Sequence, residues 1–230
     1  MRDLACGVRF TTPDPACGHH GCWDGWAEPL RTWPNLVTAV RAVGTAVLSA
    51  AALATGRPDL LLAGLVVYLV LDVVDGWVAR WLRQETRAGA LFDVLADRAS
   101  SVAFWLPWAV WHPEVALPVS VYVLEFVLVD GLLSTLWLAW PLLSCNHTAR
   151  VDPWVHRLNW SPPAKALNTG VLVVLVLLWP QPLLATVAVT AVLVLKVVSL
   201  VRLHGLLPAP GPGCATRPLR PPVRTTSPTP

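Results

Sequence analysis

Long apolar runs separated by short polar segments are the dominant pattern of this 230-residue chain. A transmembrane helix needs about 20 mostly apolar residues to cross the hydrocarbon core of a bilayer. The chain has six candidate runs, at 36–55, 60–80, 90–111, 115–139, 166–179 and 183–203. The fifth run is short, so we expect its helix to start near Pro163 and to include Lys165. The pattern predicts an all-α integral membrane protein with six transmembrane helices.

The two ends of the chain lack this pattern and set the predicted domain boundaries. Residues 1–29 contain no early apolar run, so we expect a cytoplasmic segment and no signal peptide. The segment 24–34 has apolar residues at helical spacing, which predicts a short interfacial helix. Residues 206–230 are rich in Pro, Ser and Thr, which predicts a disordered basic tail. The membrane domain is therefore expected at 30–205.

Composition agrees with a membrane protein and excludes an ordinary soluble domain. The chain is 55% hydrophobic and 13% charged, whereas soluble domains are about 25% charged. With both termini in the cytoplasm, nearly all Arg and Lys residues lie on the cytoplasmic side, and Arg57 is the exception. We therefore predict a multi-pass protein of the cell (plasma) membrane with a cytoplasmic site. The lipid bilayer is an expected partner, and nucleic acid is not.

Tryptophan and cysteine add less to the prediction. Six of the thirteen Trp residues stand at span ends, which is typical of interfacial anchors. They are Trp105, Trp108, Trp111, Trp137, Trp140 and Trp179. Cys6 and the run CGHHGC, which includes Cys17, His19, His20 and Cys22, are similar in type to zinc ligands. Structural zinc sites usually have two paired short spacings, so a reduced tail without metal is the favoured interpretation.

Four aspartates interrupt the apolar pattern where the second and third spans meet. Carboxylates at membrane depth are costly and usually functional. Asp72 and Asp75 share one face of the second helix, and Asp93 and Asp97 share one face of the third. The short connection makes these helices antiparallel neighbours, so the two faces converge. Four converging carboxylates need cations between them, and oxygen ligands favour magnesium, manganese or calcium over zinc.

Small residues beside the aspartates predict a bound ligand. Gly76 and Ala79 leave a groove on the second helix, and Gly89 does the same on the third. Arg80 lies one turn beyond Gly76, where its guanidinium would suit a diphosphate. Helix packing alone can also require small residues, and Arg80 can be a cytoplasmic anchor. Next to four carboxylates, we favour the ligand groove.

These residues together resemble a known family signature. The pattern D-x2-D-G-x2-A-R-x8-G-x3-D-x3-D is similar to that of the CDP-alcohol phosphotransferases, and every fixed position matches. The matching residues are Asp72, Asp75, Gly76, Ala79, Arg80, Gly89, Asp93 and Asp97. The segment PNLVTAVR, from Pro34 to Arg41, resembles the first helix of that family. The resemblance covers about 30–205.

The resemblance implies a CDP-alcohol phosphotransferase fold, usually a homodimer, that releases CMP from a CDP-linked donor. It implies two divalent ions, Mg²⁺ or Mn²⁺, held by Asp72, Asp75, Asp93 and Asp97. It also implies that Asp97 is the general base. The remaining signature residues would line the nucleotide and diphosphate groove: Gly76, Ala79, Arg80 and Gly89, with Asn35 and Thr38 from the first span.

The acceptor is less strongly indicated than the donor. A residue usage typical of GC-rich bacteria favours CDP-diacylglycerol as donor and a small polar acceptor of the glycerol 3-phosphate or inositol phosphate type. Arg150, Arg157 and Lys165 are candidate acceptor-binding residues, but the S-x2-G-K-x-K-T pattern of phosphatidylglycerophosphate synthases matches only at Ser161 and Lys165. In the fourth span, we expect Glu125 and Asp130 to lie on partly different faces and to pair with Arg41 or Arg98.

Two other functions stay open at this point. A CDP-alcohol:diacylglycerol phosphotransferase would use the same chemistry with the roles exchanged. Its donor would be a CDP-linked polar alcohol, and its acceptor would be diacylglycerol. A divalent-cation transporter would also need carboxylates, but transport sites lie near the middle of the bilayer and these acids gather at one end of their helices. A phosphatidyl-transferring enzyme of phospholipid biosynthesis is the favoured prediction.

Overall fold

The computed structural model describes residues 31–140 and 142–207. The cysteine- and histidine-containing segment, most of the expected interfacial helix and nearly all of the basic tail lie outside the described residues. The described part consists of helices and their connections.

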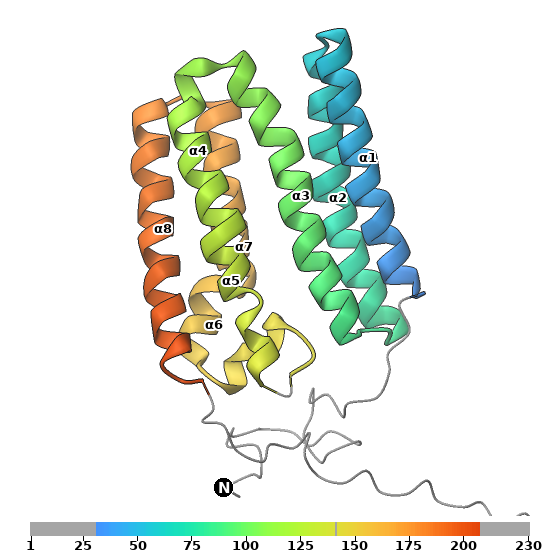
Figure 1. The fold of residues 1–230 in the computed structure, drawn as a ribbon, viewed down its shortest axis with the longest axis vertical. Helices are drawn as coiled ribbons and strands as arrows, with labels where there is room; N and C mark the ends of the chain where they lie inside the picture. Colours follow the sequence, from blue (N-terminus) through green and yellow to red (C-terminus); the bar gives the residue numbers. More distant parts are fainter. Residues whose placement is uncertain (1–30, 141, 208–230) are drawn as a thin grey trace, which may run out of the picture.

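The helices form two groups (Figure 1). The first group contains the long helices α1 (Trp33–Thr55), α2 (Pro58–Leu82) and α3 (Arg87–Trp111). The second group contains α4 (Ala116–Leu124), α5 (Asp130–Leu133), α6 (Pro153–Asn159), α7 (Pro162–Leu172) and α8 (Pro182–His204). Within the first group α1 packs on α2 and α3, and within the second α8 packs on α4 and α7. Helix α3 also contacts α4 and α5, so it joins the two groups.

Helix ends fix the geometry of the first group. The Thr32 side chain accepts a hydrogen bond from the Asn35 backbone N–H and caps α1. Helix α2 ends at Leu82 and is capped by Arg83, whose φ of 52° is in the left-handed region. Thr86 caps α3 by accepting from the Gly89 N–H at 3.0 Å. Because only residues 83–86 separate α2 from α3, these two helices must be antiparallel neighbours, as predicted.

Within the described residues, four helical segments are long and apolar enough to cross a membrane, and a bent pair would make a fifth. The four are Trp33–Thr55, Pro58–Leu82, Pro113–Ala139 and Pro182–His204, and the pair is Pro153–Asn159 with Pro162–Leu178, bent by 46°. Helix α3 is as long as α2, but its charged and polar residues make it less apolar than the four candidate spans. The described residues thus support a multi-pass membrane protein, while the six predicted spans are not confirmed.

Two π-helical segments interrupt the second group. The first, η2 (Glu125–Val129), leads directly into α5, and the Asp130 N–H donates to the Glu125 carbonyl five residues back. This i→i+5 bond brings residues five apart onto nearly the same side of the helix. Glu125 and Asp130 are therefore both buried, and our expectation of different faces is wrong at this point. The second, η5 (Val173–Leu178), continues α7.

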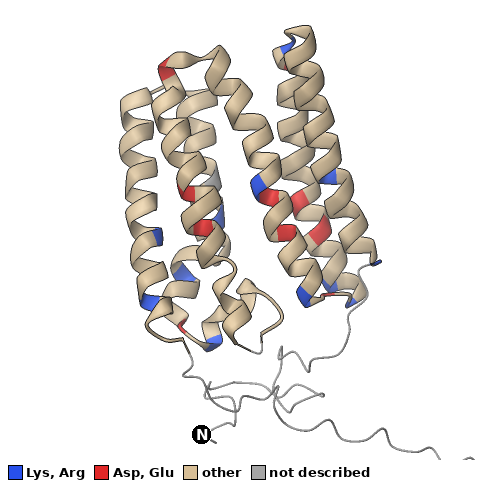
Figure 2. Cartoon of the chain, viewed as in Figure 1, with Lys and Arg blue, Asp and Glu red and all other residues tan. Residues whose placement is uncertain are grey.

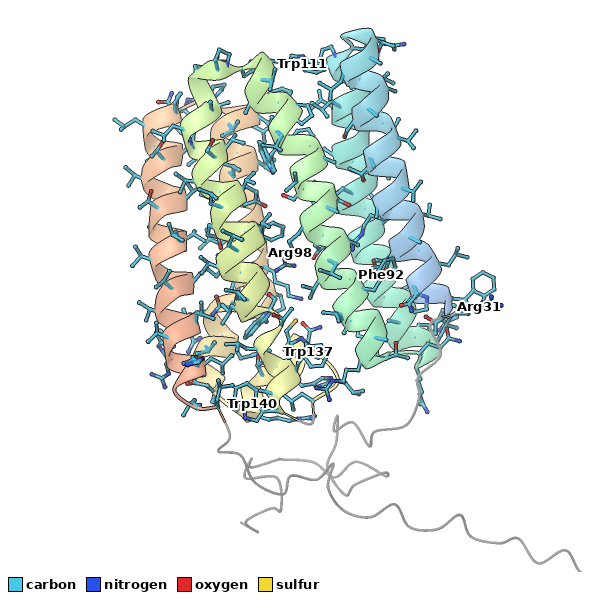
Figure 3. The ribbon with its side chains drawn as sticks, in the orientation of Figure 1. Arg31, Phe92, Arg98, Trp111, Trp137 and Trp140 are labelled. Atoms are coloured by element: carbon cyan, nitrogen blue, oxygen red, sulfur yellow. The ribbon has the colours of Figure 1, made fainter. Side chains whose placement is uncertain are left out.

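The tryptophans divide between core and surface. Trp137 and Trp140, which Figure 3 labels at the lower end of the second group, are 0% and 3% exposed. They pack in a hydrophobic cluster with Leu133, Leu142 and Val155. Trp105 of α3 is also only 3% exposed, so the prediction that these three residues are interfacial anchors is wrong. Trp179 is 63% exposed and stays available for that role.

Candidate active site

The four aspartates of the signature converge on a single arginine, Arg41 of α1. Its Nη1 forms an ion pair with Asp72 and lies 2.8 Å from Asp97 Oδ1. Its Nη2 lies 2.6 Å from Asp93 Oδ1 and 3.7 Å from Asp75 Oδ2. The predicted convergence of the α2 and α3 faces is thus present in the structure, and Figure 2 shows the acidic residues gathered in the first group. The expected pairing of Arg41 with Glu125 or Asp130 is wrong.

The acidic cluster has the chemistry of a divalent metal site. Oxygen atoms from Asp72, Asp75 and Asp93 all lie within 4.8 Å of one another. Asp72 and Asp93 are partly exposed, with 44% and 42% of their side-chain surface accessible, whereas Asp75 is buried. The Thr38 hydroxyl donates to Asp75 Oδ2 at 3.0 Å and orients that carboxylate. A set of carboxylate oxygens without sulfur or imidazole fits magnesium or manganese.

A pocket opens beside the cluster and is lined by all six residues predicted for the nucleotide groove. These are Asn35, Thr38, Gly76, Ala79, Arg80 and Gly89. Asp75 and Asp93 line the same pocket. The helix faces predicted from spacing therefore form one continuous surface that joins the small residues to two of the carboxylates.

The two signature glycines meet different neighbours. A Cβ added at Gly89 would lie 2.6 Å from Asn35 Oδ1 and 2.7 Å from Thr86 Oγ1. Such distances are far below van der Waals contact, so a larger residue would displace the Asn35 side chain or the Thr86 hydroxyl that caps α3. A Cβ at Gly76 would lie 3.3 Å from Nη1 of Arg80. The Arg80 guanidinium therefore folds back over Gly76 at the pocket.

The far wall of the pocket comes from a distant part of the chain. The residues Leu143, Ser144, Cys145 and Asn146 line it opposite the α2–α3 connection. Asn146 Oδ1 accepts from Lys165 Nζ at 3.0 Å. Burial raises the pKa of the Cys145 thiol to about 11, so it is protonated at neutral pH and is a poor nucleophile.

The candidate acceptor residues lie near this wall. Lys165 reaches the pocket indirectly, through Asn146. Arg150 belongs to η4 (Cys145–Arg150), the turn that begins in the wall, and Arg157 lies on the exposed side of α6. None of the three is among the lining residues of the pocket described above. The structure therefore places Lys165 beside the pocket wall and none of the three in the groove itself.

A second group of buried charges lies across α3 from the first. Asp130 of α5 forms ion pairs with Arg98 of α3 and Lys196 of α8. Arg98 Nη2 also donates to the Ser134 hydroxyl at 3.1 Å. Figure 3 shows Arg98 on the side of α3 that faces the second group. The sequence prediction that Asp130 pairs with Arg98 is confirmed, while Lys196 was missed as its second partner.

The sequence missed two kinds of site residue for different reasons. The pocket wall at 143–146 contains no motif, and its position depends on packing between residues far apart in the chain. Arg41 was visible, since it stands three residues after Thr38 and so shares its face. Asn35, Thr38 and Arg41 follow one another at three-residue spacing, and this spacing could have assigned Arg41 to the site.

Comparison with known proteins agrees with this geometry. A family model for CDP-alcohol phosphatidyltransferase matches residues 31–202, which span the pocket, the acidic cluster and both helical groups. No curated protein and no solved structure matches the chain significantly. The family match covers far more than half of the sequence and includes every residue of the signature. This chain therefore belongs to the CDP-alcohol phosphatidyltransferase family.

Proposed function

We propose that this protein transfers a phosphatidyl group from CDP-diacylglycerol to a small polar alcohol and releases CMP. Family membership supports a membrane transferase that acts on a CDP-alcohol, and it favours this class over a cation transporter. The observation that carries the proposal is the pocket itself. It unites the diphosphate-type groove of Gly76, Arg80 and Gly89 with the carboxylates of Asp75 and Asp93.

The carboxylates would hold the metal that this chemistry requires. Asp72, Asp75 and Asp93 provide three oxygens at suitable mutual distances, and Asp97 contacts Nη1 of Arg41, the nitrogen that also pairs with Asp72. When bound, Mg²⁺ or Mn²⁺ would neutralise the diphosphate and stabilise CMP as the leaving group. We expect two ions, with Asp97 contributing to the second.

The remaining residues would position the donor and accept a proton. Asn35, Thr38 and Arg80 line the groove where the nucleotide and diphosphate would lie. The acceptor oxygen attacks the lipid-side phosphorus, the bond from that phosphorus to the bridging oxygen breaks, and CMP leaves with the electron pair. Asp97 would take the proton of the acceptor hydroxyl, since only a well-placed acceptor is needed beside a metal.

The acceptor would approach from the side of the second helical group. Lys165, with Arg150 and Arg157 nearby, supplies the positive charge that an anionic alcohol needs. Glycerol 3-phosphate and inositol phosphate are the acceptor types that we propose. We further propose a homodimer in the plasma membrane, with both termini and the pocket on the cytoplasmic side.

A reconstituted assay tests the function directly. The purified full-length protein would be incubated with CDP-diacylglycerol, Mg²⁺ and each acceptor in turn, and both CMP and the lipid product would be measured by mass. We expect CMP and one new phospholipid, and neither product when a chelator is present. CMP release with CDP-choline or CDP-ethanolamine plus diacylglycerol, but not with CDP-diacylglycerol, would instead support the opposite donor direction. No release with any pair would refute the proposal.

Asp97→Asn is the most specific test of the mechanism. Loss of the general base should lower turnover about 10²–10⁴-fold, while the affinity for CDP-diacylglycerol should change far less. The matched control is Asp59→Asn, which removes an exposed carboxylate that pairs with Arg57 at the other end of α2. Undiminished CMP release by Asp97→Asn would show that another group takes the proton.

A further inference from the structure

Arg41 combines three properties that its neighbours do not share. It is fully buried, it bears a permanent charge, and each of the four signature aspartates contacts it. Removing an ionic side chain from water is costly unless partners compensate. Its guanidinium nitrogens Nη1 and Nη2 contact two carboxylates each, whereas Nε is buried without a hydrogen-bond partner among the described residues. The position is thus built around the carboxylates.

Arg41 and an incoming ion would approach these carboxylates from opposite sides. The guanidinium is inaccessible to solvent. It lies over the ring of Tyr68, with 5.8 Å between Arg41 Cζ and the ring centre. Asp72 and Asp93 keep more than 40% of their side-chain surface accessible. Each carboxylate has two oxygens and about four acceptor positions. The same acids can therefore contact Arg41 from within the protein and a metal from their accessible side, which at Asp93 opens into the pocket.

The charge balance makes this arrangement consequential. Four carboxylates and the Arg41 guanidinium give the cluster a net charge of −3, which Arg98 offsets in part at its edge, where Nη1 of Arg98 lies 3.7 Å from Asp97 Oδ2. One divalent ion would bring it to −1, and two would bring it to +1, which favours a bound diphosphate. Without Arg41, two divalent ions would only bring the cluster to zero. A fixed cation therefore changes both the stability of the metal-free cluster and its affinity for ions.

We propose that Arg41 is a positioning residue that gathers the four aspartates before metal binds and weakens their affinity for divalent ions. Its cost is weaker metal binding, because a positive charge repels the ion through the shared carboxylates. Its benefits are a preassembled site and a positive metal-loaded cluster. The inference deepens the proposed function, since it assumes that this cluster holds the metal of the transfer reaction.

Mn²⁺ binding to the full-length protein in detergent provides the test, measured by electron paramagnetic resonance together with thermal unfolding. Arg41→Met removes the charge at similar side-chain volume. We expect it to bind Mn²⁺ on the order of tenfold more tightly, to unfold at a lower temperature without metal, and to gain more from added Mn²⁺ than the parent does. Arg41→Lys keeps the charge, so its Mn²⁺ affinity should stay close to that of the parent.

Lys196→Met is the matched control. It also removes a buried cation, but one that pairs with Asp130 outside the cluster, so its Mn²⁺ affinity should equal that of the parent and Mn²⁺ should not restore its stability. If Arg41→Met can be recovered only with Mn²⁺ present, that result supports the proposal. Unchanged or weaker Mn²⁺ binding by Arg41→Met, no recovery even with Mn²⁺, or no Mn²⁺ binding by the parent would overturn it.

These readouts do not depend on turnover. If the metal behaviour of Arg41→Met is as expected but no CDP-linked substrate releases CMP, the proposed function fails and the role of Arg41 stands. If CMP release is metal-dependent but Arg41→Met binds Mn²⁺ like the parent, the reverse holds.

Discussion

The two charge clusters on either side of α3 have opposite compositions. In the first, one cation, Arg41, is surrounded by four aspartates. In the second, one aspartate, Asp130, lies between the two cations Arg98 and Lys196, with buried Glu125 on the same helix side. Figure 2 shows both clusters near the same level of the molecule.

The difference indicates what each cluster is for. An excess of carboxylate that is partly exposed calls for external cations, which is the property of a binding site. A buried set whose positive and negative charges balance requires no external ion, which is typical of ion pairs that hold helices together. The second cluster links α3, α5 and α8, so it holds the two helical groups together. Similar residues at similar depth thus have different roles because their charge sums differ.

Asp130→Asn should break the second cluster and have the largest effect on stability. It leaves Arg98 and Lys196 buried without their carboxylate, a loss that costs about 3–5 kcal/mol when a buried pair is broken. We expect a lower unfolding temperature in detergent that Mn²⁺ does not restore. Glu125→Gln is the control at the neighbouring buried acid and should cost less. A loss below about 1 kcal/mol would mean that the cluster does not join the helices.

Removing one hydroxyl from each cluster sharpens the comparison. Thr38→Val deletes the donor to Asp75, and Ser134→Ala deletes a partner of Arg98 and Asp130. Each should lower stability by about 1 kcal/mol, but only Thr38→Val should also reduce Mn²⁺ affinity and turnover, because Asp75 belongs to the candidate metal site. Equal effects of both variants on Mn²⁺ affinity would contradict the assignment of metal binding to the first cluster alone.

A separate ion pair outside both clusters, between Asp152 and Arg202, should show the smallest effect. Burial tends to raise the pKa of Asp152, but hydrogen bonds from Arg202 and from the backbone of Val155 and Trp154 outweigh it and leave the pKa below its ordinary value. The stabilisation is therefore present above the ordinary pKa of about 3.9 and is lost as the pH falls through the folded-state pKa. Because the Arg202 side chain is 52% exposed, we expect less than about 1 kcal/mol.

Asp152→Asn isolates this contribution. Asparagine caps a helix about as well as aspartate, so the variant keeps the cap of α6 and loses only the charge. Unfolding temperatures of parent and variant should differ slightly at pH 7 and approach each other as the pH is lowered toward 3. A difference that grows on acidification would contradict the assigned pKa direction.

Local and short-range features were predictable from the sequence. The expected spans at 60–80 and 90–111 lie within α2 and α3, and fixed spacing correctly brought Asp72, Asp75, Asp93 and Asp97 together. Helical periodicity suffices for this, because the short connection leaves the two helices only one arrangement. Gly76, Ala79, Arg80 and Gly89 share a pocket for the same reason, whereas Asn35 and Thr38 of α1 were placed there by the family resemblance.

Long-range packing was not predictable in the same way. Periodicity shows which face holds Arg41 but not which helix that face meets, so its partners were misassigned. The face of Asp130 depends on a π-helical turn, which the apolar sequence EFVLV does not reveal. The wall at 143–146 reaches the pocket through contacts of high sequence separation. A run of tryptophans at a span end likewise did not show that Trp137 and Trp140 are core residues.

Helix α3 presents Asp97 to Arg41 and the next residue, Arg98, to Asp130. Consecutive residues of an α-helix point about 100° apart, so the two ion pairs fix the angle at which α3 is turned about its own axis. Neither contact can be kept if the helix rotates by one residue. Contact with the second helical group therefore prevents rotation of α3, the helix that carries Asp93 and Asp97. Substitutions in this group must preserve that angle if the acidic cluster is to keep its arrangement.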